Sequence, residues 1–207
     1  MTRPSPRALL VGAGAVLALG LLAMGGWFWR DAAQRQAQAA YAAAMTGAQP
    51  GRGAQATPEA RAAAIQGLEA VLGRYPSAPG AAEAAYELGN LRYAAGAWAG
   101  ARGAWEIALV KATASPTLRR LAQASIGYAW EAERKYGSAA EAYRAALAAL
   151  GPQDFLYEQL LLNLARVQEV VGQKAEAVQT YRRVLAEVSQ TRRGPEIRAR
   201  LLALGAS

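Results

Sequence analysis

The residue types that carry most enzyme chemistry are missing from this sequence. It has no His and no Cys, which excludes histidine acid–base chemistry, thiol nucleophiles and Cys/His zinc sites. Glu131 and Glu133 are close in sequence, but residues two apart point to different faces of a helix and do not form a catalytic pair. We therefore expect a protein that is not an enzyme and that uses no cofactor, no metal and no small-molecule substrate.

The composition predicts helices almost throughout. Alanine and leucine dominate and β-branched residues are sparse, a bias that favours the α-helix. The run Gly12-Ala13-Gly14 resembles a fragment of a dinucleotide-binding loop. It lies inside an apolar stretch with no preceding strand, so we interpret it as a chance match.

The N-terminal part predicts a membrane anchor. A short basic tail, residues 1–7, precedes residues 8–29, which contain no charged residue. A helix of that length would reach roughly 33 Å, enough to cross a hydrocarbon core of about 30 Å. The aromatic residues 27–29 then lie next to Arg30, as expected for an aromatic belt at a membrane interface.

Two points about this segment stay open. A cleaved signal peptide ending near residues 23–25 is the alternative, but the apolar run exceeds the roughly 7–15 residues of the apolar h-region of a signal peptide. Arg3 and Arg7 precede the apolar run, and Arg30 and Arg35 follow it. The positive-inside rule thus favours a cytoplasmic N-terminus only slightly, and a soluble domain facing the cytoplasm is the alternative.

A 38-residue repeat occupies most of the remaining chain. Within each copy the recurring small, aromatic and leucine positions are four, three and one residues apart, so that they lie on one face of a helix. Small residues there let two antiparallel helices approach closely, and an aromatic residue fills the space against the next unit. The recurring residues are Ala101, Ala139 and Ala177; Trp105, Tyr143 and Tyr181; Ala108, Ala146 and Val184; Leu109, Leu147 and Leu185; and, twelve residues before each of the first set, Gly89, Gly127 and Ala165.

The repeat predicts an all-α solenoid of antiparallel helix pairs, because each pair buries its apolar face only by stacking on its neighbours. Three units fill residues 77–190. A degenerate hairpin with a polar, Gly-rich loop precedes them, and a capping helix follows. The expected bounds are 30–76 for the hairpin with its loop at 46–57; about 80–113, 116–151 and 153–190 for the units; and 194–204 for the cap.

This pattern resembles the tetratricopeptide repeat (TPR). Its hallmark, Leu-Gly followed by Ala-x3-aromatic-x2-Ala, is present as Leu88-Gly89 with Ala101, Trp105 and Ala108. It recurs from Ile126-Gly127 and, more weakly, from Leu164-Ala165. The usual period is 34 residues, and we assign the four additional residues to the start of each first helix.

The order of features also resembles the YfgM-type inner-membrane TPR proteins, which are ancillary subunits of the SecYEG translocon. The segments that carry this resemblance are GWFWRDAAQRQAQAAY (26–41), GRYPSAPGAAEAAYELGNLRYAAGAW (73–98) and ASPTLRRLAQASIGYAW (114–130). The resemblance implies a single-pass protein of the bacterial inner membrane with a periplasmic solenoid. The implied partners are translocon components, a periplasmic chaperone or a client polypeptide.

In such a stack the first helix of each unit lines the concave face, which we expect to bind protein. An adaptor for envelope, cell-division or outer-membrane assembly would use the same surface for a different client. We expect no nucleic acid as a partner. The candidate protein-binding residues are Glu83, Tyr86, Asn90, Tyr93, Tyr128, Glu131, Gln159, Leu162, Arg166 and Glu169.

The C-terminal end is rich in arginine. We interpret this cluster as a solvated capping face. A surface for anionic lipid or for an acidic protein face is the alternative. The cluster comprises Arg182, Arg183, Arg192, Arg193, Arg198 and Arg200, against Glu187 and Glu196.

Overall fold

The computed structural model describes residues 6–53 and 55–206, and side chains from Leu22 onward except that of residue 23. Every regular element in these ranges is helical, which confirms the predicted all-α class. The helices are α1 Pro6–Gly47, the 3-10 turn η1 Gln49–Gly51, α2 Pro58–Arg74, α3 Ala81–Ala94, α4 Trp98–Lys111, α5 Pro116–Ala132, α6 Tyr136–Leu147, α7 Tyr157–Val170, α8 Lys174–Glu187 and α9 Gly194–Ala203.

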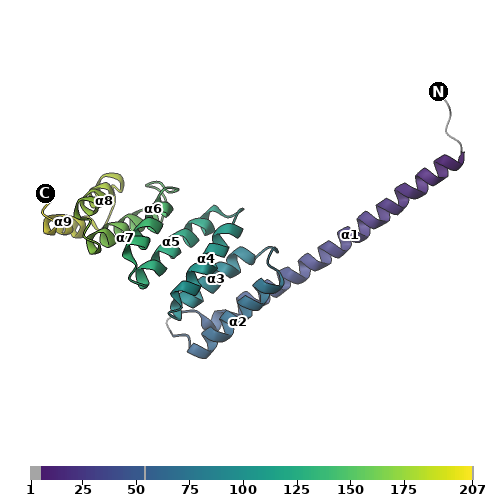
Figure 1. Ribbon diagram of the computed structural model, residues 1–207, viewed down its shortest axis with the longest axis horizontal. Coiled ribbons are helices and arrows are strands. Elements are labelled where there is room, and N and C mark those ends of the chain that lie inside the picture. Colours follow the sequence, from purple (N-terminus) through teal and green to yellow (C-terminus); the bar gives the residue numbers. More distant parts are fainter. Residues whose placement is uncertain (1–5, 54, 207) are drawn as a thin grey trace, which may run out of the picture.

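The helices stack in the order of the sequence. Each one from α2 to α8 packs against the next, and α3 also contacts α5. In Figure 1 the long α1 projects away from this stack, and α9 lies at the opposite end of the molecule. The predicted solenoid of helix pairs is therefore present, and its first helices, α3, α5 and α7, form one face.

The stacking depends on contacts between an aromatic ring and a small residue. A Cβ atom added to Gly127 would lie 2.3 Å from Cε1 of Tyr143, and one added to Gly89 would lie 2.3 Å from Nε1 of Trp105. Tyr143 and Trp105 are buried, as are the alanines four residues before them. The repeat positions named from the sequence thus form the core between paired helices.

The turns inside the units share one backbone feature. Gly96 and Gly172 follow the first helices of two units and have φ of 78° and 81°. Arg134 holds the same repeat position in the middle unit and has φ of 58°. This left-handed conformation suits Gly but is costly for a residue with a Cβ.

Side chains hold the degenerate hairpin together and join it to the first full unit. The buried Tyr41 of α1 donates a hydrogen bond to the Tyr75 carbonyl oxygen at 2.8 Å. Arg52, in the loop after α1, contacts Glu87 of α3 at 2.6 Å. The Gly-rich loop is therefore attached to the solenoid through its own arginine.

The other end of the stack is covered by α9. Ile197 and Leu201 are buried in the same apolar cluster as Leu160, Leu161 and Val184 of α7 and α8. A final helix that is apolar toward the stack and polar outside is what a solenoid end requires.

The predicted anchor, residues 8–29, lies within α1, but its side chains before Leu22 are outside the described residues. Within the described part of the chain, no helix combines the length and the apolar character that crossing a membrane requires. The structure thus does not show the membrane anchor. The tail residues 1–5 are also outside the described part.

We predict that Gly127→Ala destabilises the protein. The new Cβ would overlap the ring of Tyr143, and overpacking of this kind costs about 1–3 kcal/mol. Gly103→Ala is the matched control, because Gly103 lies inside α4 with nothing within 4 Å of an added Cβ. Thermal unfolding should show a lower midpoint for Gly127→Ala and an equal or higher one for the control. Equal stability of Gly127→Ala and wild type would contradict the packing described above.

We predict that Arg134→Gly stabilises the protein by about 1 kcal/mol, because Gly removes the Cβ clash of the left-handed conformation. Arg134→Ala keeps the Cβ and should bring no such gain. Chemical denaturation of the three proteins measures the difference in unfolding free energy. A gain shared by the Ala variant would show that loss of the arginine charge, and not backbone strain, is responsible.

Candidate functional site

The first-helix face contains a depression that collects half of the predicted binding residues. We name it the tyrosine depression; its volume is about 280 Å³. It is lined by Tyr93 of α3, Tyr128, Glu131 and Ala132 of α5, and Gln159, Asn163 and Arg166 of α7. Side chains from three consecutive units therefore meet at one place.

The other predicted residues are not part of this depression. Glu83 lies at the other end of α3, beside segments 76–82 and 110–115. Asn90 accepts a hydrogen bond from Nε1 of Trp105 at 3.2 Å, and the Tyr86 carbonyl oxygen accepts from the same atom. Asn90 is therefore engaged in packing within its own unit.

Glu131 is held between two units. Its carboxylate accepts a hydrogen bond from the Tyr143 hydroxyl at 2.9 Å. Both terminal nitrogens of the Arg166 guanidinium contact it, at 2.6 and 2.7 Å. Burial, followed by the charge of Glu131, raises the pKa of Tyr143, while the hydrogen bond to Glu131 raises the pKa of Arg166. Tyr143 thus stays neutral, and Glu131 is already neutralised by a cation.

The next unit repeats this arrangement. The Tyr181 hydroxyl donates to Glu169 at 2.5 Å, and Arg200 of α9 lies 3.9 Å from the same carboxylate. Burial, with the hydrogen bond to Glu169, raises the pKa of Tyr181. Glu131 and Glu169, predicted as partner contacts, therefore also join the second helix of one unit to the next first helix.

The first full unit differs at the equivalent position. Tyr93 takes the place of the glutamate, and its ring lies 5.7 Å from that of Trp105. Tyr93 is 37% exposed, and Tyr128 beside it is partly exposed. Burial raises the pKa of both tyrosines, so both present a neutral hydroxyl and an apolar ring. Tyrosines of this kind are frequent anchors in protein interfaces.

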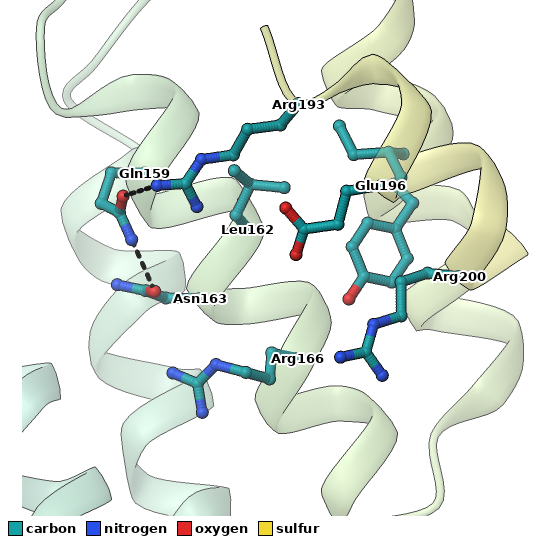
Figure 2. A pocket seen from close by; sticks show the side chains of 9 residues that line it. Gln159, Leu162, Asn163, Arg166, Arg193, Glu196 and Arg200 are labelled. Carbon is teal, nitrogen blue, oxygen red and sulfur yellow. Dashed lines mark hydrogen bonds between the residues drawn. The ribbon is translucent and has the colours of Figure 1, made fainter. Parts of the chain in front are cut away.

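A second cavity adjoins the first and shares its α7 side chains. We name it the arginine pocket, and Figure 2 shows it between α7 and α9. Its volume is about 190 Å³. Its lining is Gln159, Leu162, Asn163 and Arg166 of α7, Tyr181 of α8, and Arg193, Glu196, Ile197 and Arg200. The two cavities share Gln159, Asn163 and Arg166 of α7, and we refer to them together as the groove.

A chain of amide contacts runs through the shared wall of the groove. Arg193 donates to the Gln159 side-chain oxygen at 3.3 Å, and the Gln159 amide nitrogen donates to Asn163 at 2.9 Å. Both contacts are drawn in Figure 2. The amide orientation of Gln159 is thereby fixed.

Four further polar residues line the two cavities that the repeat pattern does not predict: Asn163, Arg193, Glu196 and Arg200. Arg193 and Arg200 belong to the basic C-terminal cluster, which the sequence indicated to be a solvated capping face. Arg193 and Arg200 line the pocket because α9 lies beside α7, in the position that the first helix of a further unit would take. The useful signal was the cap itself, because a capping helix must lie against the last unit.

Comparison with known proteins supports the fold. No protein-family model matches the chain, and no curated protein sequence matches it. A solved structure described as Podosopora anserina putative kinesin light chain nearly identical TPR-like repeats is similar to it, with a TM-score of 0.56 and 19% identity over 78% of this chain and 79% of that one. A single-substitution variant of that protein gives a TM-score of 0.57 and 19% identity over 77% and 78% of the two chains. The chain therefore has the fold of TPR-like repeats.

Proposed function

We propose that this protein is a non-catalytic scaffold that binds another polypeptide in the groove formed by the tyrosine depression and the arginine pocket. The observation that carries this proposal is the convergence of Tyr93, Tyr128, Gln159 and Arg166 from three units on one open surface. These side chains come from α3, α5 and α7, the first helices that form one face of the stack. Tyr93 and Arg166 nevertheless remain exposed.

The shape of the groove favours an extended ligand. It begins at Tyr93 of α3 and ends at Arg200 of α9, so a ligand that contacts both ends must cross the units between them. An extended polypeptide spans about 3.3 Å per residue and presents side chains at regular intervals. Such a chain suits a surface whose aromatic, amide and basic groups follow one another in a row.

We further propose that residues 8–29 anchor this scaffold in a membrane. The segment carries no charged residue, and Trp27, Phe28 and Trp29 are all more than half exposed in α1. Among the described side chains the first buried one is Ala37, eight residues beyond Trp29. At 1.5 Å per residue, α1 would hold the packed part of the chain roughly 12 Å from the aromatic residues.

The likeness in sequence architecture to YfgM-type proteins favours the bacterial inner membrane, with the solenoid in the periplasm. On this proposal the partner is a translocon component, a periplasmic chaperone or a client polypeptide. An adaptor for envelope assembly, or a solenoid facing the cytoplasm, is the competing proposal. The same groove would serve in each case, so the partner's compartment is what separates them.

We predict that photoreactive residues at Tyr93 and Tyr128 crosslink another polypeptide in intact cells. Both side chains line the tyrosine depression. Photoreactive residues at Glu106 of α4 and Glu141 of α6, which are exposed on the second helices, are the matched controls. Mass spectrometry identifies the products. Crosslinks of equal yield at all four positions, or none at Tyr93 and Tyr128, would overturn the groove as the binding surface.

We predict that the full chain stays in the membrane fraction after alkaline carbonate extraction and that deletion of residues 8–29 releases it. A phosphatase active only in the periplasm, fused after the C-terminus, should be active. A fluorescent protein that matures only in the cytoplasm should be dark at the same position. Release of the full chain would refute the anchor, and the opposite reporter result would place the solenoid in the cytoplasm.

A further inference from the structure

The arginine pocket is lined by more arginines than carboxylates. Three arginines line it, from three points of the chain, with Glu196 as the one lining carboxylate. Arg166 is paired with Glu131 at 2.6 Å, and Arg200 is 3.9 Å from Glu169. Among the described residues, the guanidinium of Arg193 bonds to the neutral Gln159 and lies within ion-pair distance of no carboxylate.

Glu196 is the carboxylate that lines this pocket. Its carboxylate points into the space between α7 and α9, with the guanidinium groups of Arg193 and Arg200 on either side (Figure 2). Within the described chain, no ion pair within 4.0 Å joins Glu196 to an arginine. The pocket therefore contains one carboxylate and retains donors for a second one.

The floor of the pocket strengthens any charged contact made there. Leu162, Tyr181 and Ile197 line it and are buried. An apolar floor lowers the local dielectric, so that a hydrogen bond between a guanidinium and a carboxylate is stronger than at an open surface. Arg193 also offers the planar, several-donor geometry that fits a carboxylate.

We propose that the arginine pocket binds the side-chain carboxylate of an Asp or Glu in an extended polypeptide partner, with Arg193 as the main contact and Arg200 as the second. The inference rests on the proposed function, since it names the chemistry of the partner for the same groove. Gln159, Asn163 and Arg166 line both this pocket and the tyrosine depression. The partner therefore carries its acidic residue at one end of a segment whose other part contacts Tyr93 and Tyr128.

The position of the pocket argues against a lipid headgroup as the source of the anion. α9 lies at the end of the stack opposite to the N-terminal end of α1 (Figure 1). If residues 8–29 are in a membrane, the arginine pocket is the part of the chain farthest along the stack from it. A polypeptide can reach that position without a membrane.

The test is binding of short labelled peptides to the full-length chain in detergent, measured by fluorescence anisotropy with an uncharged dye. Three probes share one length: a C-terminally amidated peptide AYAAEEAYA, its Gln counterpart AYAAQQAYA, and that Gln peptide with a free C-terminus. We expect the Glu peptide to bind on the order of tenfold more tightly than the amidated Gln peptide, which is the effect of one charge-assisted hydrogen bond.

The variants assign that preference to the pocket. Arg193→Gln should remove it, and Arg200→Gln should reduce it. Glu196→Gln should strengthen Glu-peptide binding, because it removes a carboxylate that faces the same arginines. Arg198→Gln is the matched control: it changes the same charge on α9, but Arg198 is exposed and does not line the pocket. It should leave the preference unchanged.

Several outcomes would overturn the inference. They are equal or absent binding of the Glu and amidated Gln peptides, an equal loss with Arg198→Gln and Arg193→Gln, and a preference shown only by the peptide with a free C-terminus. The crosslinks at Tyr93 and Tyr128 report on the proposed function separately. If they form while the Glu preference is absent, the scaffold proposal stands and the carboxylate site fails; if neither appears, both fail.

Discussion

The contact between an aromatic ring on the second helix and a small residue on the first is the constraint on which this solenoid depends. Gly127 leaves room for the ring of Tyr143, and Gly89 does so for Trp105. Because each ring is buried, it determines how closely its two helices approach. The approach of the two helices in turn sets the distance from one helix pair to the next. That distance determines where the side chains of successive first helices face one another. The groove exists because this spacing is repeated.

The polar ends of these buried tyrosines connect packing to the groove. The hydroxyl group of a buried tyrosine needs a hydrogen-bond partner, since an unpaired buried polar group costs about 1–3 kcal/mol. Tyr143 finds it in Glu131, and that carboxylate, held near the surface, attracts Arg166 of the next unit. Tyr181, Glu169 and Arg200 repeat the sequence of contacts. The ionic wall of the groove is thus a consequence of core packing, which is why residues chosen as partner contacts also have structural partners.

The features that could be predicted from the sequence were those that repeat. The 38-residue spacing identified the ring and the small residue because both recur at matching positions. The backbone conformation of Arg134 could not be predicted in this way. Arg134 adopts the left-handed turn of Gly96 and Gly172 without being Gly, so the residue type conceals the conformation. Arg193 could not be predicted as a site residue because it lies outside the repeat, next to the capping helix. Its contact with Gln159 of α7 depends on how the cap packs against the last unit.

In a stack of similar units, binding specificity has to come from the positions at which the units differ. In the middle unit, position 131 is a glutamate already satisfied by Tyr143 and Arg166, and it offers little to a partner. At the N-terminal side the same position is Tyr93, which turns an ion pair into an exposed ring. At the C-terminal side the next first helix is replaced by α9, and the guanidinium of Arg193, just before α9, donates to the side-chain amide oxygen of Gln159 on α7. On the proposed function, one end of the groove suits an apolar or aromatic side chain and the other an acidic one. This asymmetry would give a bound polypeptide a direction, which identical units could not provide.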